Sequence, residues 1–218
     1  MAKNNHPSTT DIRDKLDIKL FSQHFSSFSG DRIELKDAKV IAQLYARLEN
    51  TISVLSDLEG RKSYLYLGGV ADQIGFEPIS TEINSIWEDE LLSRVHPDDL
   101  QKKYRLEFSF SQLLKSIDLT ERTNYSLITK LRIKNQKGKY VSIKHRLLYL
   151  SSTSDGNVSL ALCLYDIVAP ATSPATVAKI MGSLVVLAAA TPMARLEIEM
   201  MPSFAPNTAA LNQLLRWI

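Results

Sequence analysis

Alternation of apolar and polar residues in the second half of the chain, clear in the first two of three segments, predicts three consecutive strands. They run from Tyr125 to Lys134, from Lys139 to Ser151 and from Val158 to Val168. The segments between them, Asn135 to Gly138 and Ser154 to Asn157, are rich in turn-forming residues and predict two hairpins. In the middle strand one face is expected to carry Val141, Ile143, His145, Leu147 and Tyr149.

Apolar residues at helical spacing predict three helices, about Asp11 to Phe28, about Lys36 to Asn50, and Pro97 to about Lys115. Two short strands, Ile52 to Leu58 and Lys62 to Gly68, follow the second helix, and a broken helical region leads from Val70 to Val95. Pro97 suits the first turn of the third helix, because the N–H it lacks would have no partner there. Together these elements predict an α+β fold.

The apolar residues of the second helix lie in one stripe along its surface, and this stripe allows two interpretations. It either packs only on the domain, or it also forms the seam of a homodimer. Its apolar residues are Val40, Ile41, Leu44, Tyr45 and Leu48.

Composition divides the chain of 218 residues, because only five residues between Ala169 and Ile218 are charged. We expect an N-terminal segment with a helix (1–34), a central domain (35–168), a linker (169–178) and a small C-terminal unit (179–218). The net charge of +2 argues against a broad polybasic nucleic-acid binder. The N-terminus has no apolar signal segment and no stretch is long enough to span a membrane, so we expect a cytoplasmic protein.

The central block resembles a known family. Its marks are the segments Ser56 to Gly69, Ile86 to Asp99, which contains His-Pro-Asp-Asp, and Lys137 to Arg146, which contains Gly-Lys-Tyr. Together with the order of elements, they resemble the sensor half of PAS-containing, LuxR-type regulators of the Bacteroides group. The resemblance implies a PAS-like five-stranded antiparallel sheet with flanking helices, a signal-sensing role in transcription regulation and no enzymatic activity.

The tail resembles an imperfect LuxR-type helix-turn-helix. Val185-Val186 falls in its first helix, Leu196 to Glu199 in its scaffold helix, and Ala205 to Thr208 at the start of its recognition helix. The resemblance implies that DNA would be contacted by Asn207, Thr208, Asn212 and Arg216. Leu196 replaces the scaffold lysine, Pro202 interrupts the scaffold helix, and Arg216 is the single cation of the recognition helix, so we expect weak DNA binding. The alternative is a stand-alone ligand-binding or interaction module.

Three candidate residues lie in the sensor region. His145, in an apolar row, is either a satisfied core residue or a polar anchor in a ligand cavity, and Trp87 either packs the short helices on the sheet or lines that cavity. Cys163, the single cysteine, has no base beside it in the sequence and is expected to be a packed core thiol rather than a reactive or flavin-binding one.

Two further features are expected to be structural. His96 is expected to cap the third helix rather than to catalyse or bind haem. Lys130, Arg132, Lys134, Lys144 and Arg146 form a cationic row, which is either a solvated face or a docking surface. The sequence indicates no metal site and no particular cofactor, and we expect neither haem nor covalent flavin. The expected partners are a second copy through the N-terminal helices, a small molecule in the sensor domain and DNA through the tail.

Overall fold

The computed structural model describes residues 9–22, 33–79, 81–153, 155–168 and 196–199. The helices are α1 (Thr9–Phe21), α2 (Leu35–Leu48), α3 (Gly69–Ile74), α4 (Asp89–Leu92) and α5 (Pro97–Lys115), with a 3-10 turn at Arg122–Asn124. The strands are β1 (Ile52–Asp57), β2 (Lys62–Leu67), β3 (Glu82–Ile83), β4 (Tyr125–Lys134), β5 (Tyr140–Ser152), β6 (Val158–Ile167) and β7 (Leu196–Glu199). The α+β prediction is confirmed, and the bounds of α5 and β4 are those expected.

One sheet runs in the order β3-β2-β1-β6-β5-β4-β7. The six strands from β3 to β4 are antiparallel to their neighbours, and β7 joins the far edge parallel to β4. The five strands that the sequence predicted form its centre. Both hairpin turns close as expected, with Gly138 at φ 74° and Gly156 at φ 77°, a backbone region that glycine enters without a steric penalty.

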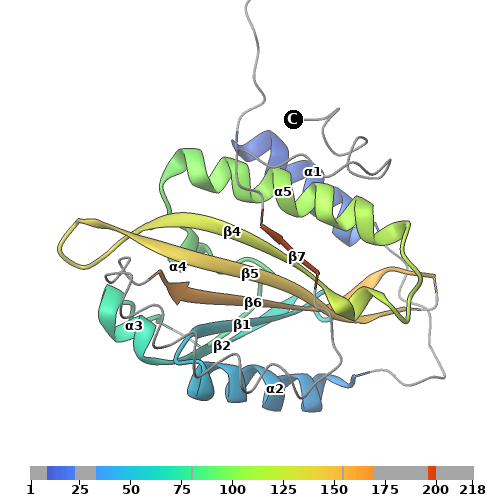
Figure 1. Cartoon of the computed structure of the whole chain (residues 1–218), viewed down its shortest axis with the longest axis horizontal. Helices are drawn as coiled ribbons and strands as arrows, with labels where there is room; N and C mark the ends of the chain where they lie inside the picture. Colours follow the sequence, from blue (N-terminus) through green and yellow to red (C-terminus); the bar gives the residue numbers. More distant parts are fainter. Residues whose placement is uncertain (1–8, 23–32, 80, 154, 169–195, 200–218) are drawn as a thin grey trace, which may run out of the picture.

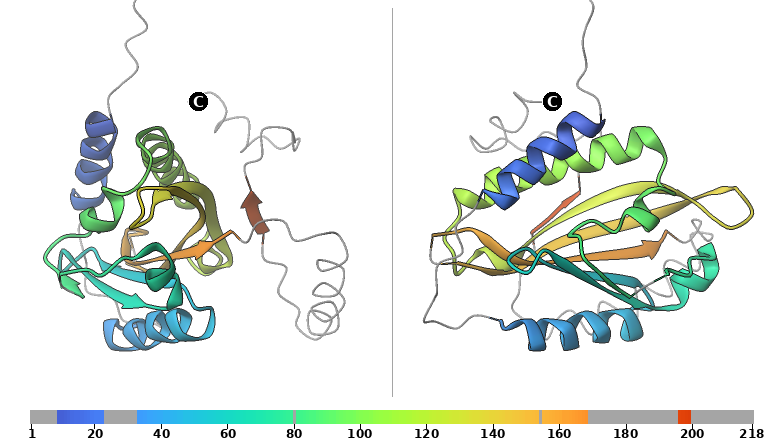
Figure 2. Two further views of the ribbon diagram at one scale, coloured as in Figure 1. Left: turned by 90° about the vertical axis from the view of Figure 1, so that its left-hand side faces the viewer. Right: turned by 180° about the vertical axis from the view of Figure 1, so that it is seen from behind.

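Helices cover both faces of the sheet (Figure 1). The helices α1 and α5 lie together on one face and α2 lies on the other, as the two turned views also show (Figure 2). The expected apolar face of β5 is confirmed, because Ile143, Leu147 and Tyr149 belong to the main core under α1 and α5. Leu148 on the opposite face packs in a second, smaller core under α2.

The stripe on α2 divides between two faces of the helix. Ala38, Ala42 and Ala46 are the buried residues and pack on the sheet, because small side chains let the helix approach closely. Three large apolar residues of the stripe are exposed: Val40 by 54%, Leu44 by 47% and Leu48 by 81%. The packing of α2 on its own domain therefore uses the alanines together with Ile41 and Tyr45 of the stripe, whereas the other three stripe residues stay exposed.

Some expectations about the two ends of the chain need correction, and others concern segments outside the described residues. The first helix ends at Phe21, and most of its expected continuation to Phe28 lies outside the described residues, as do the linker (169–178) and the contact residues Asn207, Thr208, Asn212 and Arg216. Leu196–Glu199, expected in a scaffold helix, form the strand β7. The physical reason is the alternation of Leu196 and Ile198 with two glutamates, which suits an extended edge strand beside β4.

Candidate functional site

The main core contains a cavity of about 50 Å³ between α1, α5 and the sheet. Such a volume holds only a few water molecules or a molecule of few heavy atoms. Most of its lining is apolar, and its polar members come from β1, the segment before α4, α5 and β6. The lining residues are Leu16, Leu20, Ser56, Leu58, Ile86, Trp87, Glu88, Lys103, Glu107, Leu147, Tyr149, Ala161 and Cys163.

Two charged residues of α5 face this core. Lys103 Nζ lies 2.8 Å from Glu107 Oε1, and the two side chains are 1% and 6% exposed. Residues four apart lie on the same side of a helix, and this pair lies in phase with the buried Tyr104, Phe110 and Leu114. The ion pair therefore lies at a position where apolar side chains would avoid the free-energy cost of taking two charges out of water.

Burial and neighbouring charges act on these groups in opposite directions. Burial raises the pKa of the Glu107 carboxyl, and the Lys103 ammonium opposes that rise. For Lys103, burial acts to lower the pKa, but the Glu107 and Glu88 carboxyls outweigh it and hold the pKa above its ordinary value. The lysine therefore stays charged inside the core.

His145 lies beside this pair. Its Nδ1 is 2.9 Å from Thr129 Oγ1, its Nε2 is 3.8 Å from Glu107 Oε1, and its side chain is fully buried. Nε2 has no hydrogen-bond partner. Burial, with a smaller contribution from the Lys103 charge, lowers the pKa of His145 well below its ordinary value, so the ring is neutral at neutral pH.

Cys163 Sγ also belongs to the cluster. A donor atom of Cys163, one of His145 and one of Glu107 all lie within 4.8 Å of one another. The sequence analysis found no base beside this cysteine along the chain, but the sheet brings His145 close to it. Burial raises the pKa of the thiol well above its ordinary value, so the sulfur carries its proton in the folded chain.

Of the two roles that the sequence analysis considered for Trp87, the structure shows the position in the cavity wall, and its other contacts are with α1 and α5. It lines the cavity, and its Nε1 donates a hydrogen bond of 2.6 Å to Asp17 of α1. Its ring also packs edge-on against Tyr104 of α5, at 5.4 Å between ring centroids. The tryptophan thus connects α1, α5 and the loop before α4. Next to it, Tyr165 donates a hydrogen bond to the Glu88 carboxylate inside the core.

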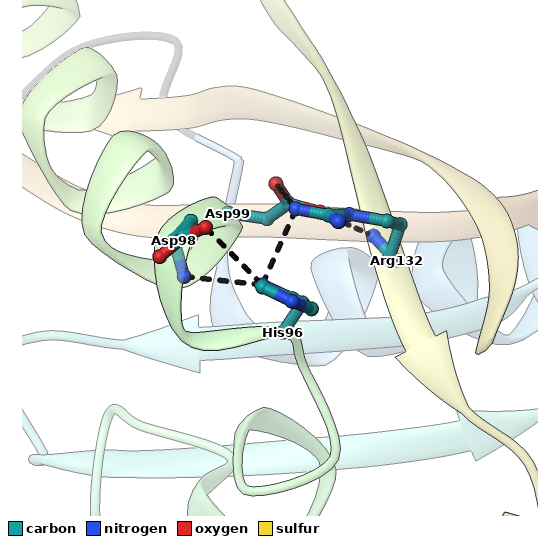
Figure 3. Close-up of polar contacts among 4 residues, drawn as sticks. All are labelled: His96, Asp98, Asp99 and Arg132. Atoms are coloured by element: carbon teal, nitrogen blue, oxygen red, sulfur yellow. Dashed lines mark hydrogen bonds and ion pairs between the residues drawn. The ribbon is translucent and has the colours of Figure 1, made fainter. Parts of the chain in front are cut away.

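His96 caps α5, as expected. Its Nδ1 accepts a hydrogen bond of 3.3 Å from the Asp98 N–H, and Arg132 Nη2 lies 3.2 Å from the same atom (Figure 3). Arg132 also donates to both carboxylate oxygens of Asp99, at 2.7 and 2.8 Å. This ion pair lowers the pKa of Asp99. The His-Pro-Asp-Asp segment therefore attaches the start of α5 to β4.

The cationic row is not one solvated surface. Arg146 is buried under α2, where its guanidinium is 2.6 Å from Glu49 Oε2, and Arg132 is engaged by Asp99. Lys144 lies 3.6 Å from Asp166, whereas Lys130 and Lys134 are exposed. Three members of the row are therefore paired with carboxylates of the same chain, and the other two face solvent.

Sequence reasoning found two members of the site and missed the rest. It selected His145 and Trp87, and the structure places Trp87 in the cavity wall and His145 directly behind Glu107. Lys103 and Glu107 were missed, although their phase with Tyr104 along α5 was a usable signal. Their meeting with His145 and Cys163 depends on the pairing of β5 with β6, which no local pattern contains.

Comparisons with solved structures return PAS and light-oxygen-voltage sensor domains. A sensory box histidine kinase/response regulator from Burkholderia thailandensis is 17% identical with a TM-score of 0.40, and the match covers 67% of this chain and 94% of that one. A light-oxygen-voltage domain is 12% identical with a TM-score of 0.41, covering 69% and 99%. The PAS domain of Bordetella pertussis BvgS is 14% identical with a TM-score of 0.37, covering 69% and 98%.

No family model and no curated protein matches the chain. The fold is PAS-like in its strand order, with the first two strands beside the last and the helices inserted between the second and third long strands. The relation to LuxR-type regulators and to the Bacteroides group rests on the sequence resemblance alone. Among the described residues, no helix is long and apolar enough to cross a membrane.

Proposed function

We propose that this chain is a non-catalytic, signal-sensing module of the PAS type, whose cavity between α1, α5 and the sheet binds a small molecule. The supporting observation is the ion pair of Lys103 and Glu107 in the cavity wall, with side chains 1% and 6% exposed. Buried charges are expensive unless they are paired, and a purely structural core is served as well by apolar side chains. Charges that border a cavity suit recognition of a polar group.

The size of the cavity assigns a role to α1 in this proposal. Leu16 and Leu20 of α1 form part of the wall, so a ligand larger than a few heavy atoms displaces this helix. Polar contacts help to hold α1 in place: Arg13 donates to both carboxylate oxygens of Asp89 at 2.6 and 3.0 Å, and Trp87 donates to Asp17 at 2.6 Å. Ligand binding and the position of α1 are therefore coupled.

The test is native mass spectrometry of the protein purified from its source organism, beside the variant Ala161→Leu. Ala161 lines the cavity and is 7% exposed, so a leucine there fills space that a ligand needs. We expect the wild-type protein to carry an additional small mass that the variant lacks. The control is Leu67→Ala at a 40% exposed position, which should retain the mass. An equal mass on wild type and Ala161→Leu, or none on either together with no stabilisation by a panel of small acids and amines, contradicts the proposal.

For the output we propose a homodimer through α2. Val40, Leu44 and Leu48 form an exposed apolar row on the side of α2 away from the sheet, and α2 leads directly into β1. Because the connection is short, a movement of β1 would also move α2 and its exposed apolar row.

A LuxR-type DNA-binding output is the second candidate, and the resemblance of the tail favours it. The strand β7 occupies the position of the expected scaffold helix, and this supports an impaired rather than an active module. Fluorescence anisotropy with a mixed DNA library at low salt is expected to show weak, salt-sensitive binding. Tight sequence-specific binding near physiological salt contradicts the impairment, and complete absence of binding favours the stand-alone module.

A further inference from the structure

Three side chains of types that can bind metal ions converge from three elements, with Glu107 and Cys163 in the wall of the cavity and His145 beside them. Glu107 comes from α5, His145 from β5 and Cys163 from β6, and all three are buried. Their donor atoms lie within 4.8 Å of one another. Carboxylate, imidazole and thiolate are the ligands that zinc takes in proteins, and a site with three protein ligands leaves a fourth position open.

His145 is oriented as a metal-binding histidine is. Thr129 Oγ1 lies 2.9 Å from Nδ1 and can accept its proton, while Nε2 has no hydrogen-bond partner and faces Glu107. A second-shell group that holds one ring nitrogen leaves the lone pair of the other nitrogen available to a metal ion. In the tautomer with the proton on Nδ1, that lone pair and the carboxylate oxygen 3.8 Å away face each other without a bond unless a cation lies between them.

We propose that Glu107, His145 and Cys163 form a binding site for a zinc-class divalent cation, with the fourth coordination position open to the cavity. Tetrahedral bonds of about 2.0–2.3 Å place donor pairs roughly 3.3–3.6 Å apart, so small side-chain rotations close the site. On binding, the Cys163 thiol releases its proton to solvent and its sulfur bonds the metal. The thiolate and the Glu107 carboxylate then balance the two charges of the ion.

Lys103 is the internal competitor of this site. Its ammonium lies 2.8 Å from Glu107 Oε1 and neutralises the carboxylate that the metal would use. Metal binding therefore displaces the ammonium from that oxygen, and Lys103→Met should tighten metal binding. The inference does not depend on whether the cavity also binds an organic molecule.

The test is a titration of the tag-free full chain with Co²⁺, followed by competition with Zn²⁺. Cys163 is the single cysteine of the chain, so a thiolate-to-cobalt charge-transfer absorption arises from this residue alone. We expect the band to saturate at one equivalent of Co²⁺ and to disappear when Zn²⁺ displaces the cobalt. Cys163→Ser should abolish it, and His145→Gln and Glu107→Gln should each weaken metal affinity by roughly tenfold or more.

The matched control is His96→Gln, at a partly exposed histidine that caps α5, and it should leave the band and the affinity unchanged. Absence of a charge-transfer band in the folded wild-type chain overturns the site, whatever the variants do. A band that persists unchanged in folded His145→Gln, as judged by circular dichroism, overturns the assignment of this histidine. No organic ligand is added, so failure of this test leaves the small-molecule proposal to its own measurement.

Discussion

Replacing Lys103 with methionine tests whether burial makes the ion pair on α5 important for stability. The change removes a cation that is 1% exposed and leaves the Glu107 carboxylate, 6% exposed, without its partner 2.8 Å away. Removing one member of a buried pair costs about 3–5 kcal/mol, because the other charge stays buried and uncompensated. Since urea lowers the stability of small domains by about 1–3 kcal/mol per molar, the unfolding midpoint should fall by roughly 2 M.

The same structure supplies a matched control. Lys62 Nζ and Glu82 Oε1 are also 2.8 Å apart, but their side chains are 41% and 51% exposed. Because solvent screens an exposed pair, Lys62→Met should change the midpoint little. Urea unfolding followed by circular dichroism at neutral pH compares the two variants, so burial is the difference between them.

The double variant Lys103→Met/Glu107→Leu completes the cycle. It removes both charges of the pair and should recover most of the lost stability, because the Glu107 carboxylate is no longer buried without its partner. The reasoning is refuted if Lys103→Met is no more destabilising than Lys62→Met, or if the double variant is less stable than Lys103→Met alone.

Three further predictions concern other parts of the chain. The folded-state pKa of His145 is lowered below its ordinary value of 6.5, so the unfolded chain binds the proton first as the pH falls. The contribution of His145 to the free energy of unfolding is therefore complete above pH 6.5 and is lost as the pH falls toward the folded-state pKa. Urea unfolding from about pH 7 to about pH 5 should therefore be less pH-dependent in His145→Gln than in wild type, by at most about 1.4 kcal/mol per pH unit, and equal slopes would contradict the assignment. Asp99 has a lowered pKa through Arg132, so its stabilisation is present above about pH 3.9 and lost as the pH falls further, and Asp99→Asn should lose less stability than wild type over that acid range. Leu44→Asp/Leu48→Asp should give a folded monomer by sedimentation and circular dichroism, since burying each leucine in a dimer contributes on the order of 1.5–3 kcal/mol; a wild-type chain that is monomeric at high concentration, or a variant that unfolds, argues against the dimer.

Local periodicity was sufficient to predict most of the elements. The two-residue period of β4 and of the first part of β5 follows from strand geometry, and Gly138 and Gly156 mark turns where the backbone has positive φ. The start of α5 was equally readable, because Pro97 fits a first helical turn. These features depend on neighbours within a few residues, so a single sequence carries them.

Burial was harder to predict where amphipathic patterns are ambiguous. On α2 both an alanine face and a larger apolar stripe have helical spacing, and the sheet selected Ala38, Ala42 and Ala46. Arg146 was expected in an outward row, but α2 covers it and Glu49 pairs with it. The choice between such faces depends on which surface another element covers.

The sequence by itself determined the order of the long elements up to β6, the two hairpins, the buried face of β5 and the presence of His145 and Trp87 in or beside a core. Tertiary structure alone decided that Lys103 and Glu107 of α5 meet His145 and Cys163. The physical reason is that β5 and β6 pair across the hairpin while α5 packs over them, so donors far apart in the sequence converge only when the sheet register and the rotation of the helix are both set. A charged pair enters the core in this way because the free energy of burying the whole helix face outweighs the cost of burying two paired charges.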